Sequence, residues 1–227
     1  MNDEVIRLYN ENKLLVRGLD LPIKRPSKDY YDCSIWGSQF ECMMHDDYCN
    51  ISSTLIIPNI PIEIYKNAGF LVNSDLVDCF HICRHDSLSS GSRRTNTFRA
   101  APPDFKTIAE LAQFIKKNYH TTMNEVNFDG NLDGVVGLFL KKCDHINMNL
   151  ERIYFAQKCI ELVTNIKYPI YIYDGTIGSI VKLEMTDELE ESIIENSNIH
   201  NLLCLFQSDR RDDVIFESIS NVSTKRL

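Results

Sequence analysis

Two charged positions near opposite ends of the chain have side chains suited to holding and polarising a ligand. Arg17 and Gly18 follow the apolar run Leu14–Val16. A guanidinium at a strand end suits a diphosphate, and a glycine beside it lets a ligand approach the backbone. Near the other end, Asp212 and Asp213 are adjacent carboxylates, so a buried one would have a perturbed pKa. Taken singly, both patterns are also typical of charged surface turns.

A second kind of chemistry would use a thiol. Cys33, His145 and Asp174 occur in the chain order of nucleophile, base and orienting acid found in cysteine proteases and deamidases among effector proteins of similar size. Asp174 follows a predicted strand and is well placed to orient an imidazole. No helix is predicted to begin at Cys33, however, and His145 precedes a helix, which counts against a thiolate with a lowered pKa.

A third kind of chemistry would use a metal ion. Cysteine and histidine alternate over residues 79–85, and on a strand this period of two places all four side chains on one face. The first and last would lie about 20 Å apart and cannot share an ion. The alternating residues are Cys79, His81, Cys83 and His85. Two neighbours among them could bind zinc together with residues of a Cys-x2-His-x3-Cys group, whose spacing suits that ion. That group consists of Cys42, His45 and Cys49. A strand with buried cysteines and packed or exposed histidines explains the pattern better, and the spacing matches no standard zinc module, so no metal site is predicted.

Three helices are predicted from caps and apolar periodicity. Thr107 begins a capping box with Glu110, after two prolines that end the preceding segment. Asn149–Val163 carries an apolar face and ends before Pro169, and Thr186 caps an acidic first turn leading to Glu195.

Seven short apolar runs are predicted to be strands, and the pair at 170–173 and 180–183 is predicted to form a hairpin. The predicted strands are Leu14–Val16, Thr54–Ile57, Val135–Leu140, Ile170–Tyr173, Ile180–Leu183, Leu202–Phe206 and Asp213–Ser218. They do not alternate regularly with helices. We therefore expect an α+β fold with a mixed, mostly antiparallel sheet core and three or more flanking helices.

The composition predicts a single globular domain over residues 1–227, with a mobile basic loop at 87–99. With 24 basic and 32 acidic residues the net charge is −8, which argues against binding to nucleic acid or to an anionic membrane. No apolar run is long enough to span a membrane. The start of the chain lacks a secretory signal pattern, so the eight cysteines are expected to be reduced thiols, mostly buried. We expect a cytoplasmic protein, or one secreted without a classical signal into a host cytosol.

The order of several short motifs resembles the mono-ADP-ribosyltransferases of bacterial toxins and effectors. In that family an Arg ends an early strand, a helix with alanine and aromatic residues follows a central strand, a Tyr-Ile-Tyr strand comes next, and an acid opens a late strand. The corresponding residues here are Val16-Arg17-Gly18, Tyr154-Phe155-Ala156, Tyr171-Ile172-Tyr173 and Asp212-Asp213-Val214. Two features depart from the family. Its Ser-Thr-Ser would lie near Phe139-Leu140-Lys141, where there is no serine, and its catalytic Glu would be Asp213, one methylene shorter.

The resemblance implies an NAD-dependent mono-ADP-ribosyltransferase that modifies a protein target. Arg17, with Gly18, would hold the NAD phosphates. Asp213 would hydrogen-bond the nicotinamide ribose and stabilise an oxocarbenium-like transition state. Arg211, two residues before the acid, would face the protein substrate. Two alternatives stay open: a cysteine protease or deamidase using Cys33, His145 and Asp174, and a non-enzymatic acidic interaction protein such as an immunity protein or adaptor.

Overall fold

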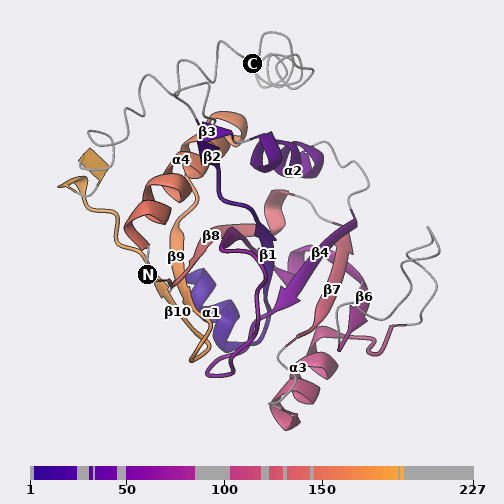
Figure 1. Ribbon diagram of the computed structural model, residues 1–227. Helices are drawn as coiled ribbons and strands as arrows, with labels where there is room; N and C mark the ends of the chain where they lie inside the picture. Colours follow the sequence, from indigo (N-terminus) through magenta and orange to yellow (C-terminus); the bar gives the residue numbers. More distant parts are fainter. Residues whose placement is uncertain are drawn as a thin grey trace. The chain divides into compact units, whose positions relative to one another are not determined.

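A computed structural model describes most of the first 191 residues of the chain (Figure 1). The described residues are 3–24, 31–32, 34–44, 50–84, 103–118, 123–129, 132–143, 146–188 and 190–191. The chain divides into two compact units. The first comprises Met1–Asp20, Cys42–Asp144 and Tyr168–Leu183, and the second comprises Leu21–Glu41, His145–Lys167 and Glu184–Leu227.

An eight-stranded sheet forms the centre of the first unit. Its strands follow the order β10-β9-β8-β5-β1-β4-β7-β6. All neighbours are antiparallel except β8 and β9, which are parallel. The mixed, mostly antiparallel α+β class predicted from the sequence is therefore confirmed. The strands are β1 (Leu14–Leu19), β4 (Asn50–Leu55), β5 (Ala68–Asn73), β6 (Asp78–Cys83), β7 (Glu125–Asp129), β8 (Val135–Lys141), β9 (Ile170–Asp174) and β10 (Ser179–Lys182).

The central position of β1 depends on a glycine in its neighbour β5. Every residue of β5 is buried. A Cβ added at Gly69 would lie 1.8 Å from the carbonyl oxygen of Arg17, so only glycine allows this close approach of the two strands. The register pairs Gly69 with Gly18 across the same ladder. Gly69 thus brings β5 tightly against the half of β1 that carries Arg17.

Two capped helices belong to the first unit. In α1 (Glu4–Asn10) the N-cap Asp3 accepts a hydrogen bond from the backbone of Ile6, and α1 contacts β1 and β8. In α3 (Ile108–Lys117) Thr107 Oγ1 accepts from the Glu110 backbone at 3.2 Å, as the capping box predicts. Two short 3-10 turns, η1 (Ser74–Leu76) and η2 (Leu132–Gly134), complete this unit.

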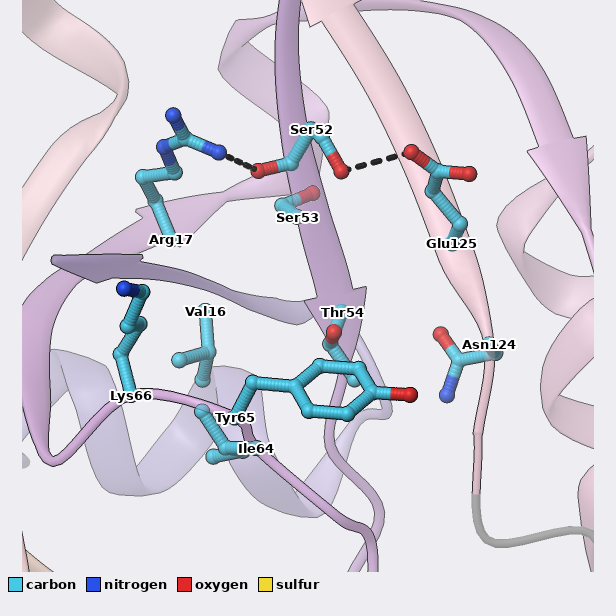
Figure 2. Close-up of a pocket in the computed structure, with 11 residues that line it drawn as sticks. Val16, Arg17, Ser52, Ser53, Thr54, Ile64, Tyr65, Lys66, Asn124 and Glu125 are labelled. Atoms are coloured by element: carbon cyan, nitrogen blue, oxygen red, sulfur yellow. Dashed lines mark hydrogen bonds between the residues drawn. The ribbon is translucent and has the colours of Figure 1, made fainter. Parts of the chain in front are cut away.

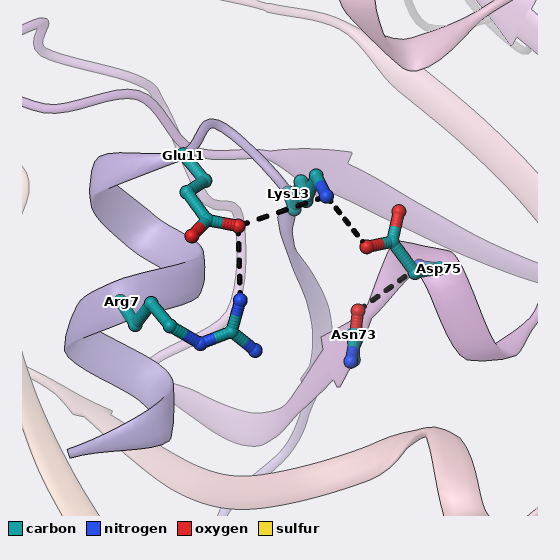
Figure 3. A network of polar contacts seen from close by, with 5 residues as sticks. All are labelled: Arg7, Glu11, Lys13, Asn73 and Asp75. Carbon is teal, nitrogen blue, oxygen red and sulfur yellow. Dashed lines mark hydrogen bonds and ion pairs between the residues drawn. The ribbon is translucent and has the colours of Figure 1, made fainter. Parts of the chain in front are cut away.

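Exposed ion pairs connect α1, the start of β1 and η1 (Figure 3). Arg7 Nη1 lies 3.0 Å from Glu11 Oε2, and Lys13 Nζ lies 3.6 Å from the same oxygen. Lys13 Nζ also lies 2.7 Å from Asp75 Oδ2. All four side chains are well exposed, so water screens these pairs and their contribution to stability is small.

The second unit contains the remaining short strands and the longest helix. The strands β2 (Ile23–Lys24) and β3 (Tyr31–Asp32) pair antiparallel. From α4 (Ile146–Thr164), Arg152 donates to the carbonyl oxygens of Pro22 and Leu21, and the Tyr154 hydroxyl donates to Glu190. The backbone of Glu190 bonds to the Thr186 carbonyl, as expected for the predicted third helix, whose later residues lie outside the described part.

Helix α2 (Ser34–Met44) corrects an expectation from the sequence. It begins directly after Cys33, where no helix was predicted, although Trp36, Phe40 and Met43 follow the i, i+4, i+7 spacing of a helix face. All three side chains are buried. Helix α4 and strands β8, β9 and β10 lie where the sequence predicts them. Strands β9 and β10 pair as the predicted hairpin. The strand predicted at Thr54–Ile57 lies earlier, as β4, and those at Leu202–Phe206 and Asp213–Ser218 lie outside the described residues.

Candidate functional site

A pocket opens where two central strands of the sheet separate. Strand β1 pairs with β4 only at Leu15↔Leu55 and Val16↔Thr54, although it pairs with β5 along its whole length. Beyond that point the first half of β4 pairs with β7 instead. The gap is a cavity of about 280 Å³, lined by residues of β1, β4, the segment before β5, and the start of β7 (Figure 2). All of these elements belong to the first unit.

Arg17 lies at the point of separation rather than at the end of its strand, since β1 continues to Leu19. Its Nη1 donates to the carbonyl oxygen of Ser52 at 2.9 Å, across the gap between β1 and β4. Its Nε is buried and has no hydrogen-bond partner among the described residues. Burial lowers the pKa of Arg17, and the nearby Glu125 carboxylate opposes that shift. The guanidinium remains charged and has a donor to spare for a ligand.

Opposite Arg17, a serine-rich stretch of β4 meets a buried acid from β7. Ser52 Oγ donates to Glu125 Oε1 at 2.7 Å, so the backbone of Ser52 binds Arg17 while its hydroxyl binds Glu125 (Figure 2). Glu125 is only 5% exposed, yet it lines the cavity. A carboxylate held in this way, in a largely water-excluded site, can stabilise positive charge that develops on a bound ligand.

Two neighbouring side chains hold the backbone on either side of Glu125. The amide of Asn124 accepts from the Leu55 backbone N–H at 2.8 Å and donates to the Leu55 carbonyl at 3.0 Å. Ser53 Oγ donates to the Val126 carbonyl at 2.7 Å. All three contacts are buried. The acid therefore projects from a backbone that is fixed one residue before it and one residue after it.

The mouth of the pocket carries a second cation and an aromatic ring. Lys66 Nζ lies 2.9 and 2.7 Å from the two carboxylate oxygens of Asp20. A Cβ added at Gly18 would lie 2.9 Å from Cβ of Lys66. This glycine therefore makes room for the stem of Lys66. Tyr65 is 63% exposed, and its hydroxyl lies 3.5 Å from the sulfur of Met123.

Of the other residues expected from the resemblance, those that the structure describes do not line this pocket. Phe139-Leu140-Lys141 lies in β8, between β5 and β9, and Phe139 and Leu140 are fully buried. Ser52, Ser53 and Thr54 of β4 line the pocket. Arg211 and Asp213 lie outside the described residues, as does the basic loop at 87–99. Of the predicted site residues, the pocket contains Arg17 and Gly18.

The thiol and metal hypotheses gain no support from the described residues. Cys33 and His145 lie outside them, and Asp174 is bound by Lys142 Nζ at 2.7 Å and by Thr176, which lowers its pKa to about 2. Burial raises the pKa of the Cys79 thiol to about 11 and also raises that of Cys83. Both groups are therefore protonated at neutral pH, unlike a reactive thiol.

The expected single-faced row of cysteines and histidines is interrupted. The register of β6 shifts between Cys79 and His81, so that Cys79 pairs with Phe128 of β7 and His81 with the adjacent Asn127. Because adjacent strand residues point to opposite faces, Cys79 and His81 do not share a face. His81 and Cys83 share a face, with Sγ 3.4 Å from Nδ1. Among the residues that the structure describes, no three potential ligands come together for a metal ion. His45, Cys49 and His85 and the side chain of Cys42 are not described.

Glu125 and the serine-rich stretch were missed at the level of sequence, although a signal for both exists. Residues 125–129 read Glu-Val-Asn-Phe-Asp, a strict alternation of polar and apolar residues that is typical of a strand. Ser52-Ser53-Thr54 leads directly into the apolar run Leu55-Ile56-Ile57. Only the pairing of β4 with both β1 and β7 shows that these residues belong with Arg17.

Comparison with known proteins identifies no relative. No protein-family model matches the sequence, and a search of curated proteins finds no significant match. Within the described part of the chain, no helix combines the length and the apolar character needed to cross a bilayer. The chemistry of the pocket is therefore the basis on which a function can be inferred.

Proposed function

We propose that this protein is an NAD-dependent mono-ADP-ribosyltransferase that modifies a protein target. The observation that supports this most is the convergence of Arg17, Ser52 and Glu125 in one pocket. The family that the sequence resembles uses an arginine on an early strand, a serine-rich stretch and a late acid. The pocket contains these residue types in the same order along the chain, with Glu125 in place of Asp213.

Each of the three residues suits one part of the reaction. Arg17 is a charged donor with an unpartnered Nε and suits the diphosphate of NAD. The bond between ribose C1′ and the nicotinamide nitrogen breaks, and its electron pair goes to nicotinamide, which leaves as a neutral base. Glu125 stabilises the positive charge that develops on the ribose, while Ser52 fixes the direction of its carboxylate.

The target side chain then supplies the electron pair for the new bond. Its nucleophilic atom bonds to ribose C1′ and loses a proton, so the products are the ADP-ribosylated protein, nicotinamide and a proton. By the resemblance, the residue two before the acid faces the protein substrate. For Glu125 that residue is Met123, whose sulfur lies 3.5 Å from the hydroxyl of the exposed Tyr65. An apolar rim is therefore expected beside the acid.

The test compares nicotinamide release from NAD, and transfer of labelled ADP-ribose to protein in a cell lysate, between wild type and four variants. Glu125→Gln is expected to lose about 100-fold or more of both activities, because it removes the charge that stabilises the transition state. Arg17→Lys is expected to raise the NAD concentration required, because an ammonium cannot reproduce the guanidinium fork. Glu63→Gln, an exposed acid in the same unit, is the matched control and should behave as wild type.

Asp213→Asn decides between the two candidate acids. Full activity in this variant, with loss in Glu125→Gln, supports the assignment made from the pocket. The reverse result would return the catalytic role to Asp213. Wild-type protein that releases no nicotinamide and transfers no label under any condition tried would refute the proposed function.

A further inference from the structure

Two cations lie at the same pocket, but they are held in different ways. Arg17 reaches across the gap between β1 and β4, where its Nη1 is bound to the Ser52 carbonyl. Lys66 comes from the segment before β5 and is paired with Asp20. Both side chains line the cavity (Figure 2). A ligand with two adjacent anionic groups would therefore meet two positive side chains.

The ion pair of Lys66 is of the kind that exchanges easily. The side chains of Lys66 and Asp20 are 46% and 56% exposed. Exposed pairs of this kind are weak because water competes for both charges. Lys66 can therefore leave Asp20 for a stronger anion at little cost, whereas the part-buried bond of Arg17 connects two strands of the pocket wall.

Gly18 keeps the stem of Lys66 at the edge of the cavity. A side chain at this position would meet Cβ of Lys66 at 2.9 Å and Cγ at 3.1 Å. The close contact places the stem of Lys66 against β1 at Gly18, and Lys66 and Arg17 both line the pocket. The buried acid Glu125 lies on the β7 side of the pocket and repels anions. The charges therefore orient a ligand with its anionic part at Arg17 and Lys66 and its uncharged part toward Glu125.

We propose that Lys66 is the second cation of a diphosphate site, and that Asp20 is a competing carboxylate that the ligand displaces. Lys66 binds one phosphoryl group and Arg17 the other. The identification of the diphosphate as that of NAD rests on the proposed function. The role of Asp20 does not, since any diphosphate in this pocket would have to replace it.

Calorimetric binding of inorganic pyrophosphate and of ADP-ribose tests this proposal. Asp20→Asn is expected to tighten the binding of both by about twofold to fivefold, the range expected for removal of an exposed ion pair. Lys66→Gln is expected to weaken both by about tenfold, because a charge-assisted hydrogen bond to phosphate is lost. Adenosine, which has no phosphate, should be insensitive to either change.

A second lysine–aspartate pair provides the matched control. Lys13 and Asp75 are 2.7 Å apart, are 39% and 52% exposed, and lie outside the pocket. Lys13→Gln and Asp75→Asn should leave binding of both probes unchanged. Thermal melting of every variant checks that the fold is intact, which is expected because all four side chains are at the surface.

The outcomes separate this inference from the proposed function. Equal affinities of wild type and Lys66→Gln, or no binding of either probe by wild type, would overturn the role of Lys66. Nicotinamide release together with equal affinities would leave the proposed function standing without it. Binding of pyrophosphate that depends on Lys66, in a protein that never cleaves NAD, would support the diphosphate site and contradict the proposed function.

Discussion

Asn124 is the side chain on which the position of Glu125 depends most directly. The register of β4 and β7 pairs Ser53 with Val126, so Asn124 lies opposite Leu55, one residue before the start of strand β7. Its amide makes both hydrogen bonds to Leu55 that a backbone partner would make in a continued ladder. Replacing Asn124 with Ala removes both bonds at once.

The expected loss follows from the burial of these groups. Asn124 is 5% exposed, and both bonds are buried. The substitution leaves the N–H and the carbonyl of Leu55 without their partner in a region that water reaches poorly. An unsatisfied buried polar group costs about 1–3 kcal/mol, so the loss of both partners should lower the free energy of unfolding by about 2–6 kcal/mol.

Urea unfolding followed by circular dichroism measures this loss. Asn67→Ala replaces an exposed asparagine in the same unit and should change stability by less than about 0.5 kcal/mol. Nicotinamide release by the folded fraction of Asn124→Ala should also fall, because Glu125 loses its fixed backbone. A stability loss in Asn124→Ala as small as that of the control would refute the argument that this amide holds the start of β7.

Asn124→Asp tests the same contact through pH. The new carboxylate can accept from the Leu55 N–H, but when ionised it repels the Leu55 carbonyl, so the pKa in the folded protein should be raised. A raised carboxyl pKa means that the destabilisation is present above the folded pKa and is relieved as the pH falls through it. The stability of Asn124→Asp relative to wild type should therefore improve as the pH is lowered from 7 toward about 4.

Two further predictions concern groups outside the pocket. Hydrogen bonds from Lys142 and Thr176 lower the pKa of Asp174 to about 2. The contribution of Asp174 to stability is therefore present at neutral pH and is lost as the pH falls from the ordinary aspartate value through about 2. In Lys142→Met, an NMR titration should find this pKa shifted upward, and an unchanged value would show that Lys142 is not the main cause of the lowered pKa. Because desolvation raises the pKa of both Cys79 and Cys83, iodoacetamide at pH 7.5 should label these residues much more slowly in native than in urea-unfolded protein. Equally fast labelling, read from peptide masses, would contradict their assignment as protonated thiols.

Elements with strong local signals were predictable from the sequence. The cap at Thr107 and the apolar face after it specify α3, because an unsatisfied helix start needs a side-chain acceptor. The uninterrupted apolar run of β8 and the alternating run of β9 likewise predict strands. In each case a stretch of fewer than twenty neighbouring residues contains the information.

Strands with mixed polarity were harder to recognise. The polar residues of β7 are Glu125, Asn127 and Asp129, and the first two are 5% exposed. The burial of Glu125 depends on Ser52, which lies 73 residues earlier in the chain. A buried carboxylate of this kind contradicts the usual rule that charged residues are exposed, and its partner could not be found by inspecting nearby residues. The pairing of Ser52 with Glu125 therefore could not be predicted from either strand alone.

The arrangement of the pocket explains why Arg17 was recognisable and its partners were not. An arginine after an apolar run stands out locally, but its role depends on where β1 leaves β4. That divergence follows from the pairing of β4 with β7, which connects residues more than seventy positions apart. Strand order and register are non-local properties, and a slip of one residue would turn Ser52 and Glu125 to the other face of the sheet. The convergence of Arg17, Ser52 and Glu125 is thus a property of the register, and it appears only when three strands are paired correctly at once.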